Sequence, residues 1–282
     1  MEITSANLSH SFFEAHYIEL QFSAIFGGMV ILFLIEGFIS RKTTEASQTS
    51  RWLSNIGLAF FNHFLIIFYA ILVIGVISKL QPDSPLLKHF QFSDISAFII
   101  VFLIMEFTNY WIHRAFHRVP ILWRIHAVHH SDTEIDVTTS HRHHPFEPMI
   151  TALLTTPIVF ALGAPFIIVA THNLLQTALS LISHGNISIP QKLDNILRLF
   201  IITPDFHRMH HSSNKKYTDS NYSAIVPWFD YLFRTSSRLP YDKIPKMELG
   251  LKTFRKPADN RLDKLLITPF IYKPDTSNKK SA

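Results

Sequence analysis

The chain has 282 residues, of which 48% are hydrophobic and only 17% are charged, a balance too apolar for an ordinary soluble domain and suited to a protein partly solvated by lipid. Its formal net charge of +5 comes without a long Lys/Arg block, so we expect no nucleic acid as a partner. Cysteine is absent, which excludes disulfides, thiolate metal sites and a cysteine nucleophile.

Four long apolar runs predict membrane-spanning helices, each close to the roughly 20 residues that cross a bilayer. They cover residues 20–40, 56–80, 95–111 and 149–170, and a shorter apolar piece covers residues 174–182. Pro157, Gly163 and Pro165 inside the fourth run predict a broken helix that returns with the shorter piece as a hairpin or re-entrant pair. The alternative, a set of buried helices in a large soluble protein, does not account for three long runs with consistent flanking charges.

Basic residues flank these runs on one side: Arg41, Lys42 and Arg51 lie between the first two runs, and Arg114, Arg118 and Arg124 follow the third. Positive charge favours the cytoplasmic side of a membrane. The first twenty residues lack a basic region followed by an apolar run, so no cleavable signal is expected. The sequence thus predicts an all-α, integral, multi-pass membrane protein with about four transmembrane helices, two hairpins being one arrangement, and a cytosolic helical cap.

Three parts are expected along the chain: an N-terminal segment of residues 1–19, a single membrane domain of residues 20–236, and a polar C-terminal tail of residues 237–282. The membrane domain carries histidine motifs within residues 106–147 and 184–211. Since these motifs mostly follow the apolar runs, folding brings them to the boundary between membrane and cytosol. An apolar substrate would reach such a site from the lipid.

Histidine is the unusual residue of this sequence, because its 17 positions outnumber the 8 tyrosines and 4 tryptophans together. Four clusters stand out, and one further histidine ends the shorter apolar piece: His113 and His117; His126, His129 and His130; His141, His143 and His144; His207, His210 and His211; and His184. Histidines three or four residues apart share one face of a helix. A redox metal that activates O2 needs several such ligands and an open position, so the pattern predicts a histidine-held metal centre.

The remaining histidines have a simpler interpretation, as amphipathic side chains near a membrane interface: His10, His16, His63, His89 and His172. His141 and His143 fit either a surface position or the site. His144 precedes Pro145, which favours an extended backbone, and is either a ligand or a residue lining the site.

Four motifs resemble those of the fatty acid hydroxylase superfamily, which includes sterol desaturases, sterol C4-methyl oxidases and alkylglycerol monooxygenase. They lie at residues 106–117, 123–131, 142–147 and 203–211, with a weaker signature at 221–223 and 229–235. The resemblance covers roughly residues 95–236. Departures from the family pattern fall on supporting positions and not on the expected ligands: Glu106 stands for Asp, Phe229 for Trp, and Ser223 and Arg234 for Gly.

This resemblance implies a non-haem di-iron centre, O2 as co-substrate and a four-helix membrane core. Carried over by position, the implied catalytic metal ligands are His113, His117, His126, His129, His130, His184, His207, His210 and His211. Further residues are expected to orient the ligands, bind a head group or ligate: Arg114, Arg142, His144, Glu147 and Arg208.

The sequence hypothesis is therefore a membrane-bound oxygenase that hydroxylates or desaturates a lipid of fatty acyl, sterol-like or ether type. Electrons are expected from a separate donor, either a reductase, a cytochrome b5-like or ferredoxin-like protein, or a pterin. Three alternatives stay open: a membrane metal-binding or metal-transport protein, an intramembrane metalloprotease, and a bis-histidine haem protein. The protease normally shows His-Glu-x-x-His, which is absent here. A transporter would carry its histidines inside the apolar runs.

Overall fold

The computed structural model describes residues 12–43, 48–77, 86–90 and 92–273. Within these residues the regular elements are all helical, and the two isolated β-bridges join Ser40 to Ile187 and Ser212 to Leu249. The predicted all-α fold is confirmed.

Four helices are long and apolar enough to cross a membrane: Tyr17–Ile39, Thr49–Val73, Asp94–Arg118 and Phe166–His184. The first is continuous through α2 (Tyr17–Phe22), the π-helical turn η1 (Ser23–Gly27) and α3 (Gly28–Ile39), and the others lie in α4 (Thr49–Ile77), α6 (Asp94–Arg118) and α9 (Phe166–His184). The chain is therefore a multi-pass membrane protein, as the apolar runs predict. The expected end of the second run, residues 78–80, lies outside the described residues, which resume at α5 (Leu86–His89).

The fourth predicted run is divided between two helices. The apolar helix α8 (Phe146–Leu162) contains Pro157 but ends at Gly163, whose φ is 64°. Glycine adopts this left-handed conformation without a Cβ clash, and it stops the helix. Pro165 then precedes α9, so residues 166–170 belong to the same helix as the shorter apolar piece. The broken-helix prediction holds, with the break falling inside the run that we expected to span.

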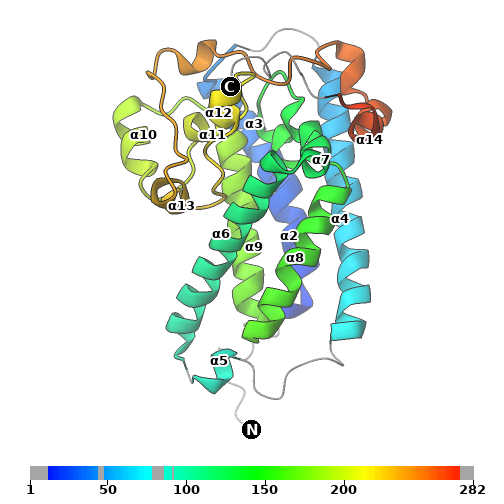
Figure 1. Cartoon of the computed structure of the whole chain (residues 1–282), viewed down its shortest axis with the longest axis vertical. Helices are drawn as coiled ribbons and strands as arrows, with labels where there is room; N and C mark the ends of the chain where they lie inside the picture. The colour runs from blue at the N-terminus through cyan, green and yellow to red at the C-terminus, as the bar shows by residue number, and fades with distance from the viewer. Residues whose placement is uncertain (1–11, 44–47, 78–85, 91, 274–282) are drawn as a thin grey trace.

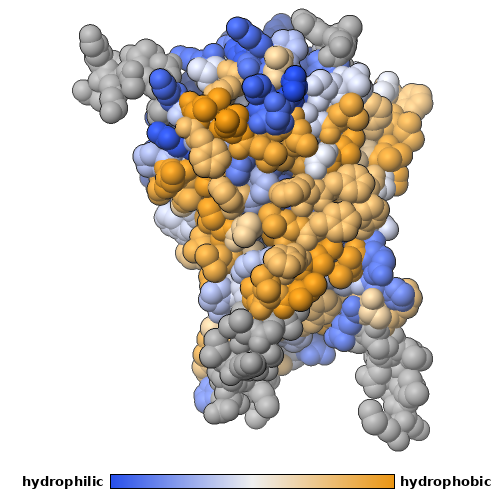
Figure 2. Space-filling model, turned by 90° about the vertical axis from the view of Figure 1, so that its right-hand side faces the viewer, coloured by the Kyte–Doolittle hydropathy of each residue, from blue (hydrophilic) through white to orange (hydrophobic). Residues whose placement is uncertain are grey.

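The spans and α8 meet at one end of the bundle, where shorter helices form a cap (Figure 1). The cap, defined here as residues 119–145 and 185–273, contains α7 (Pro120–His130), η2 (Val137–His141), α10 (Gln191–Leu197), α11 (Pro204–His210), α12 (Lys215–Thr218), α13 (Trp228–Leu232), η3 (Ile244–Lys246), η4 (Pro257–Asn260) and α14 (Leu262–Ile271). Figure 2 shows hydrophobic residues over the middle of one face and hydrophilic residues at the cap end. An apolar surface of this kind suits a lipid-solvated bundle.

Two carboxylates inside the spans hold loops of the cap. Glu36 of α3 accepts the backbone N–H groups of Val137 and Asn186 through one oxygen, each at 2.8 Å. Glu106 of α6 accepts the N–H of Ile225 at 2.9 Å. Charged groups inside a membrane are costly unless paired. These two are paired with the backbone segments that flank the histidine clusters, so they fix the cap on the bundle.

The expectation that His63 and His172 are interfacial side chains is wrong, because both are buried. His172 is completely enclosed, and its Nε2 lies 3.0 Å from a carboxylate oxygen of Glu106. His63 packs against the rings of Phe22 and Phe26. The sequence could not reveal this, because the partners come from other helices.

Candidate metal centre

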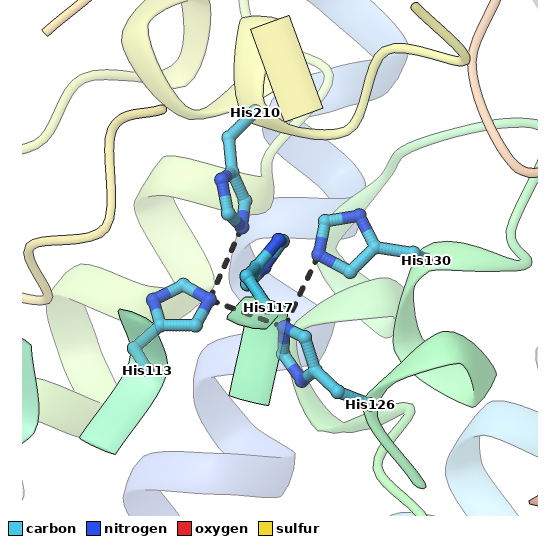
Figure 3. A group of neighbouring side chains, drawn as sticks. All are labelled: His113, His117, His126, His130 and His210. Atoms are coloured by element: carbon cyan, nitrogen blue, oxygen red, sulfur yellow. Dashed lines mark hydrogen bonds between the residues drawn. The ribbon is translucent and has the colours of Figure 1, made fainter. Parts of the chain in front are cut away.

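The nine histidines that the sequence singles out as ligands gather in two adjacent groups where α6, α7, α9 and α11 meet. In each group, one ring nitrogen from every member lies within 4.8 Å of the others. The first group, drawn in Figure 3, contains His113, His117, His126, His130 and His210. The second group contains His129, His184, His207 and His211.

Each H-x-x-H-H motif supplies both groups. In α7, His126 and His130 enter the first group, while His129 enters the second. In the motif of α11 the assignment is reversed: His207 and His211 enter the second group, while His210 enters the first. An α-helix turns by about 100° per residue, so positions i and i+4 point within about 40° of each other while i+3 points about 60° to the other side. One helix can thus face two metals.

Local sequence signals start the two short helices that carry these motifs. Pro120 begins α7 at its first turn, where the missing N–H costs nothing. Thr203 caps α11 by accepting the N–H of Phe206 at 3.4 Å, and Pro204 follows it. Arg41 at the end of the first span forms a two-pronged ion pair with Asp205, at 2.9 Å, which ties α11 to the bundle.

Hydrogen bonds to backbone carbonyls fix the tautomer of three of these rings. Nδ1 of His113 lies 2.7 Å from the carbonyl of Tyr222, and Nδ1 of His210 lies 2.6 Å from that of Ser220. His184 makes the same contact with its own helix at 2.7 Å. A carbonyl only accepts, so Nδ1 carries the proton and Nε2 presents a bare lone pair.

Those bare Nε2 atoms face one another. The Nε2 of His113 lies 3.1 Å from the Nε2 atoms of His126 and His210, and the Nε2 of His126 lies 3.1 Å from that of His130. With Nδ1 protonated on His113, His126 and His210, both contacts of His113 bring lone pair against lone pair, which repels unless a cation lies between them. Ligand nitrogens about 2.1 Å from one ion and at right angles to each other are about 3 Å apart. The donor set therefore fits a metal ion.

Burial keeps five of the clustered histidines neutral, as metal ligands must be. Desolvation first, and the neighbouring imidazoles second, hold the pKa well below its ordinary value for each of His129, His130, His207, His210 and His211. These rings carry no positive charge near neutral pH. Their lone pairs are available to a metal without competition from protons.

A carboxylate lies directly behind the first group. Glu147 Oε1 accepts from Nδ1 of His126 at 2.8 Å and contacts Nδ1 of His143 at 2.9 Å. The ring of His143 stacks on that of His129, with centroids 4.3 Å apart and planes 13° apart. His143, which the sequence left open, therefore lies beside both groups, and Glu147 orients His126 toward the first group.

Arg142 and Arg208 do not contact the ring nitrogens and instead hold backbone segments. Arg142 is fully buried, and it donates to the carbonyl of Val128 at 3.0 Å and to Ser131 at 2.8 Å, so it fixes the end of α7. Arg208 donates to the side chain of Asn186 at 2.8 Å. Both position the helices that present the histidines.

His144 and Arg114 point elsewhere. His144 Nε2 lies 3.2 Å from the carbonyl of Leu266 in α14. Arg114 donates to the hydroxyl of Tyr110 at 3.4 Å and lies over the ring of Trp111. Neither residue belongs to a histidine group of the described chain.

A cavity of about 160 Å³ lies between α6, α8 and α9 beside the histidines. Its lining includes four polar side chains that sequence reasoning missed: Asn109, Thr151, Gln176 and Ser180. Their spacing in the sequence could have identified them. Each lies four or eight residues from a clustered histidine or from Glu147 on the same helix, and so on the same face.

Replacing Glu147 by glutamine is expected to weaken metal affinity by about 10- to 100-fold, because His126 then loses its charged hydrogen-bond acceptor. Titration of the metal-free protein with Fe²⁺ against a competing chelator measures this. Glu248→Gln, on the exposed surface, is the matched control and is expected to bind as the unaltered protein does. Equal affinity for both variants contradicts the orienting role of Glu147.

Comparison with known proteins gives several matches. The chain is 29% identical over 136 residues to alkylglycerol monooxygenase of Homo sapiens, which covers 48% of this chain and 29% of that protein. It is 28% identical over 169 residues to ornithine lipid hydroxylase OlsE of Rhizobium tropici, covering 59% and 50%. It is 30% identical over 146 residues to very-long-chain aldehyde decarbonylase CER1 of Arabidopsis thaliana, covering 46% and 22%.

These matches cover half or less of the length of each relative. No solved structure matches the chain. Residues 98–235 match the family model described as fatty acid hydroxylase, and all nine clustered histidines fall within that stretch. The resemblance seen in the four motifs is confirmed, and residues 98–235 carry a domain of the fatty acid hydroxylase superfamily.

Proposed function

We propose that this chain is a membrane-bound, non-haem di-iron oxygenase that uses O2 to hydroxylate or desaturate a lipid. One observation carries the proposal: two adjacent groups of histidines, eight of the nine buried, converge at the end of a membrane-spanning bundle. The names of the three relatives, a monooxygenase, a lipid hydroxylase and an aldehyde decarbonylase, support it.

In this proposal each histidine group holds one iron. When bound, the irons supply the redox chemistry that activates O2. The chain's own residues do the rest. Backbone carbonyls hold the Nδ1 protons of His113, His184 and His210, which keeps their Nε2 atoms aimed at the metal sites. Glu147 orients His126, and burial of eight of the nine histidines limits the access of water.

The position of the groups supports a lipid substrate. His113 and His184 lie in the last turns of two candidate spans, so the metals lie near one membrane surface. The cavity extends between α6, α8 and α9, whose outer surfaces are apolar. A substrate dissolved in the bilayer therefore has a short path to the site.

We propose that the cap is cytoplasmic, since the loop after the first span and the segment after the third carry the basic residues. We further propose that residues 20–236 form the oxygenase domain. Residues 237–273 of the tail pack on that domain, where the indole N–H of Trp123 in α7 donates to the hydroxyl of Tyr272 at 2.9 Å. A separate electron donor completes the proposed reaction.

The test is lipid profiling of cells that express the unaltered chain or a His129→Ala/His210→Ala variant, together with O2 uptake by the purified proteins. We expect one class of lipid to gain an oxygen atom or lose two hydrogens only with the unaltered chain. A bound metal with identical lipid profiles and no O2 uptake would instead favour a metal-binding or transport protein.

A further inference from the structure

Polar side chains line the cavity between the histidines and the apolar interior of the bundle. They come from three helices: Asn109 from α6, Thr151 from α8, and Gln176 and Ser180 from α9. Polar groups inside a membrane bundle are expensive and generally face a partner or a functional cavity. All four of these face the same cavity.

Their spacing places them at a defined depth below the metal sites. Asn109 lies four residues before His113, and Ser180 lies four residues before His184, on helices that both run toward the cap. Four residues are about one helical turn, or roughly 5–6 Å along the axis. Gln176 lies one turn deeper on the same face. The polar groups are thus within about two turns of the histidines.

Asn109 and Gln176 form an amide pair across α6 and α9. Nδ2 of Asn109 donates to Oε1 of Gln176 at 3.3 Å. This contact leaves one acceptor, Oδ1 of Asn109, and one donor, Nε2 of Gln176, without a hydrogen-bond partner among the described residues. Both residues line the cavity, and neither of these two atoms is sealed off, so both are accessible to a molecule bound there. A bound group that covered them without pairing them would cost free energy. A hydroxyl group, which both accepts and donates, would satisfy the two atoms together.

A purely structural role is the competing explanation, because polar pairs also join helices in membranes. Such a role accounts for the single contact between the two amides. It does not account for the hydroxyls of Thr151 and Ser180, which line the same cavity and have no side-chain hydrogen bond within the described chain. Polar groups from three helices around one space indicate a polar ligand.

The size of the cavity limits what enters it. Its volume is about 160 Å³, close to the roughly 150 Å³ of an engineered cavity that holds one benzene molecule. Only a short part of a lipid therefore fits beside the histidines. The polar group that meets the amide pair and the carbon that meets the metals must belong to the same short segment.

We propose that the substrate is a lipid bearing a hydroxyl, or another neutral group that both donates and accepts hydrogen bonds, held by Asn109 and Gln176. The C–H bond presented to the metals then lies within a few bonds of that group. A plain hydrocarbon segment would leave the amide pair unpaired. That the neighbouring carbon is oxidised rests on the function proposed above, whereas the binding preference does not.

The experiment is equilibrium binding of tritiated 1-hexadecanol to the purified, metal-loaded full chain in lipid nanodiscs, with unlabelled 1-hexadecanol or hexadecane as competitors. The unaltered protein is expected to prefer the alcohol by about tenfold or more, the effect of leaving one or two buried polar groups unpaired. In Asn109→Leu/Gln176→Met, which keeps side-chain size, the preference is expected to fall to less than about threefold. Thr171→Val is the control, because its hydroxyl bonds its own helix, at the carbonyl of Ile167.

If hexadecane displaces the tritiated alcohol from the unaltered protein as well as unlabelled 1-hexadecanol does, the proposal is overturned. A preference that survives in a folded double variant, the result expected of a purely structural pair, also overturns it. If the double variant does not fold, the same measurement is made on Gln176→Met alone, which keeps Asn109. A smaller fall in the preference for the alcohol is expected from this single variant. Iron content is measured on the same samples, so a protein that prefers the alcohol but holds no iron would contradict the proposed function alone.

Discussion

His129→Ala is expected to lower the iron content from two ions per chain to one and to reduce O2-dependent lipid oxidation by about a thousandfold or more, the effect of losing several kcal/mol of metal-based stabilisation. His129 is one of four histidines in the second group, and its Nε2 lies 3.2 Å from that of His184. The first group keeps all five of its histidines. Iron analysis and turnover on the same purified sample measure the two effects.

The matched control is His144→Ala, another buried histidine of the cap. His144 bonds the carbonyl of Leu266 and belongs to neither group, so this variant is expected to keep both irons. Full activity and two irons in His129→Ala would refute the assignment of the second group. Loss of iron from both His129→Ala and His144→Ala would mean that any substitution of a buried cap histidine disturbs metal binding. The two groups would then not be separate sites.

Asp132→Ala is expected to destabilise the protein by about 3–5 kcal/mol, because it leaves a buried guanidinium without one of its partners. Asp132 is fully buried, and its carboxylate accepts from Arg51 of α4 at 2.9 Å and from Thr139 at 2.8 Å. Arg51 also pairs with Asp136, and this network joins α4 to the loop that follows α7. The melting temperature in detergent is expected to fall on the order of 10 °C.

This loss of stability has a consequence for the metal site, since Asp132 lies only two residues after His130 in the chain. Iron is therefore expected to dissociate from Asp132→Ala at a lower temperature than from the unaltered protein. Asp263→Asn is the control, because its pair with Arg261 is exposed to solvent, and no measurable change is expected. An unchanged melting temperature for Asp132→Ala would contradict the role given to the buried network.

The membrane spans and the clustering of histidines could be predicted because both depend on local pattern. A run of about 20 apolar residues determines a span, and histidines at i, i+3 and i+4 lie on neighbouring parts of one helix. The local pattern could not predict that the histidines of each motif divide between two groups. It depends on where a second helix approaches, and only the fold shows that His126 and His129 face different partners.

Contacts between distant segments account for what the sequence did not reveal. Glu36 binds loops 101 and 150 residues away, and no local signal marks it as more than a charge in an apolar run. His172 was assigned to an interface because its partner, Glu106, lies 66 residues earlier. Arg142 fitted a head-group role until its guanidinium proved to be enclosed by backbone and amide groups.

The position of the helix break shows the same limit. Gly163 and Pro165 signal a break, but either end of the run could have joined the span. Packing decides it, because α8 and α9 both lie against α6 and together surround the cavity. The polar lining residues became recognisable only once the histidines had been placed at the top of these helices.

The central claim, that two histidine groups hold a di-iron centre, is tested most directly by iron quantification with Mössbauer spectroscopy on the protein purified without added chelator. The account predicts two non-haem irons per chain in a nitrogen-rich environment, magnetically coupled in the oxidised state. A protein that takes up no iron, a single iron per chain, or a haem absorption band would contradict it.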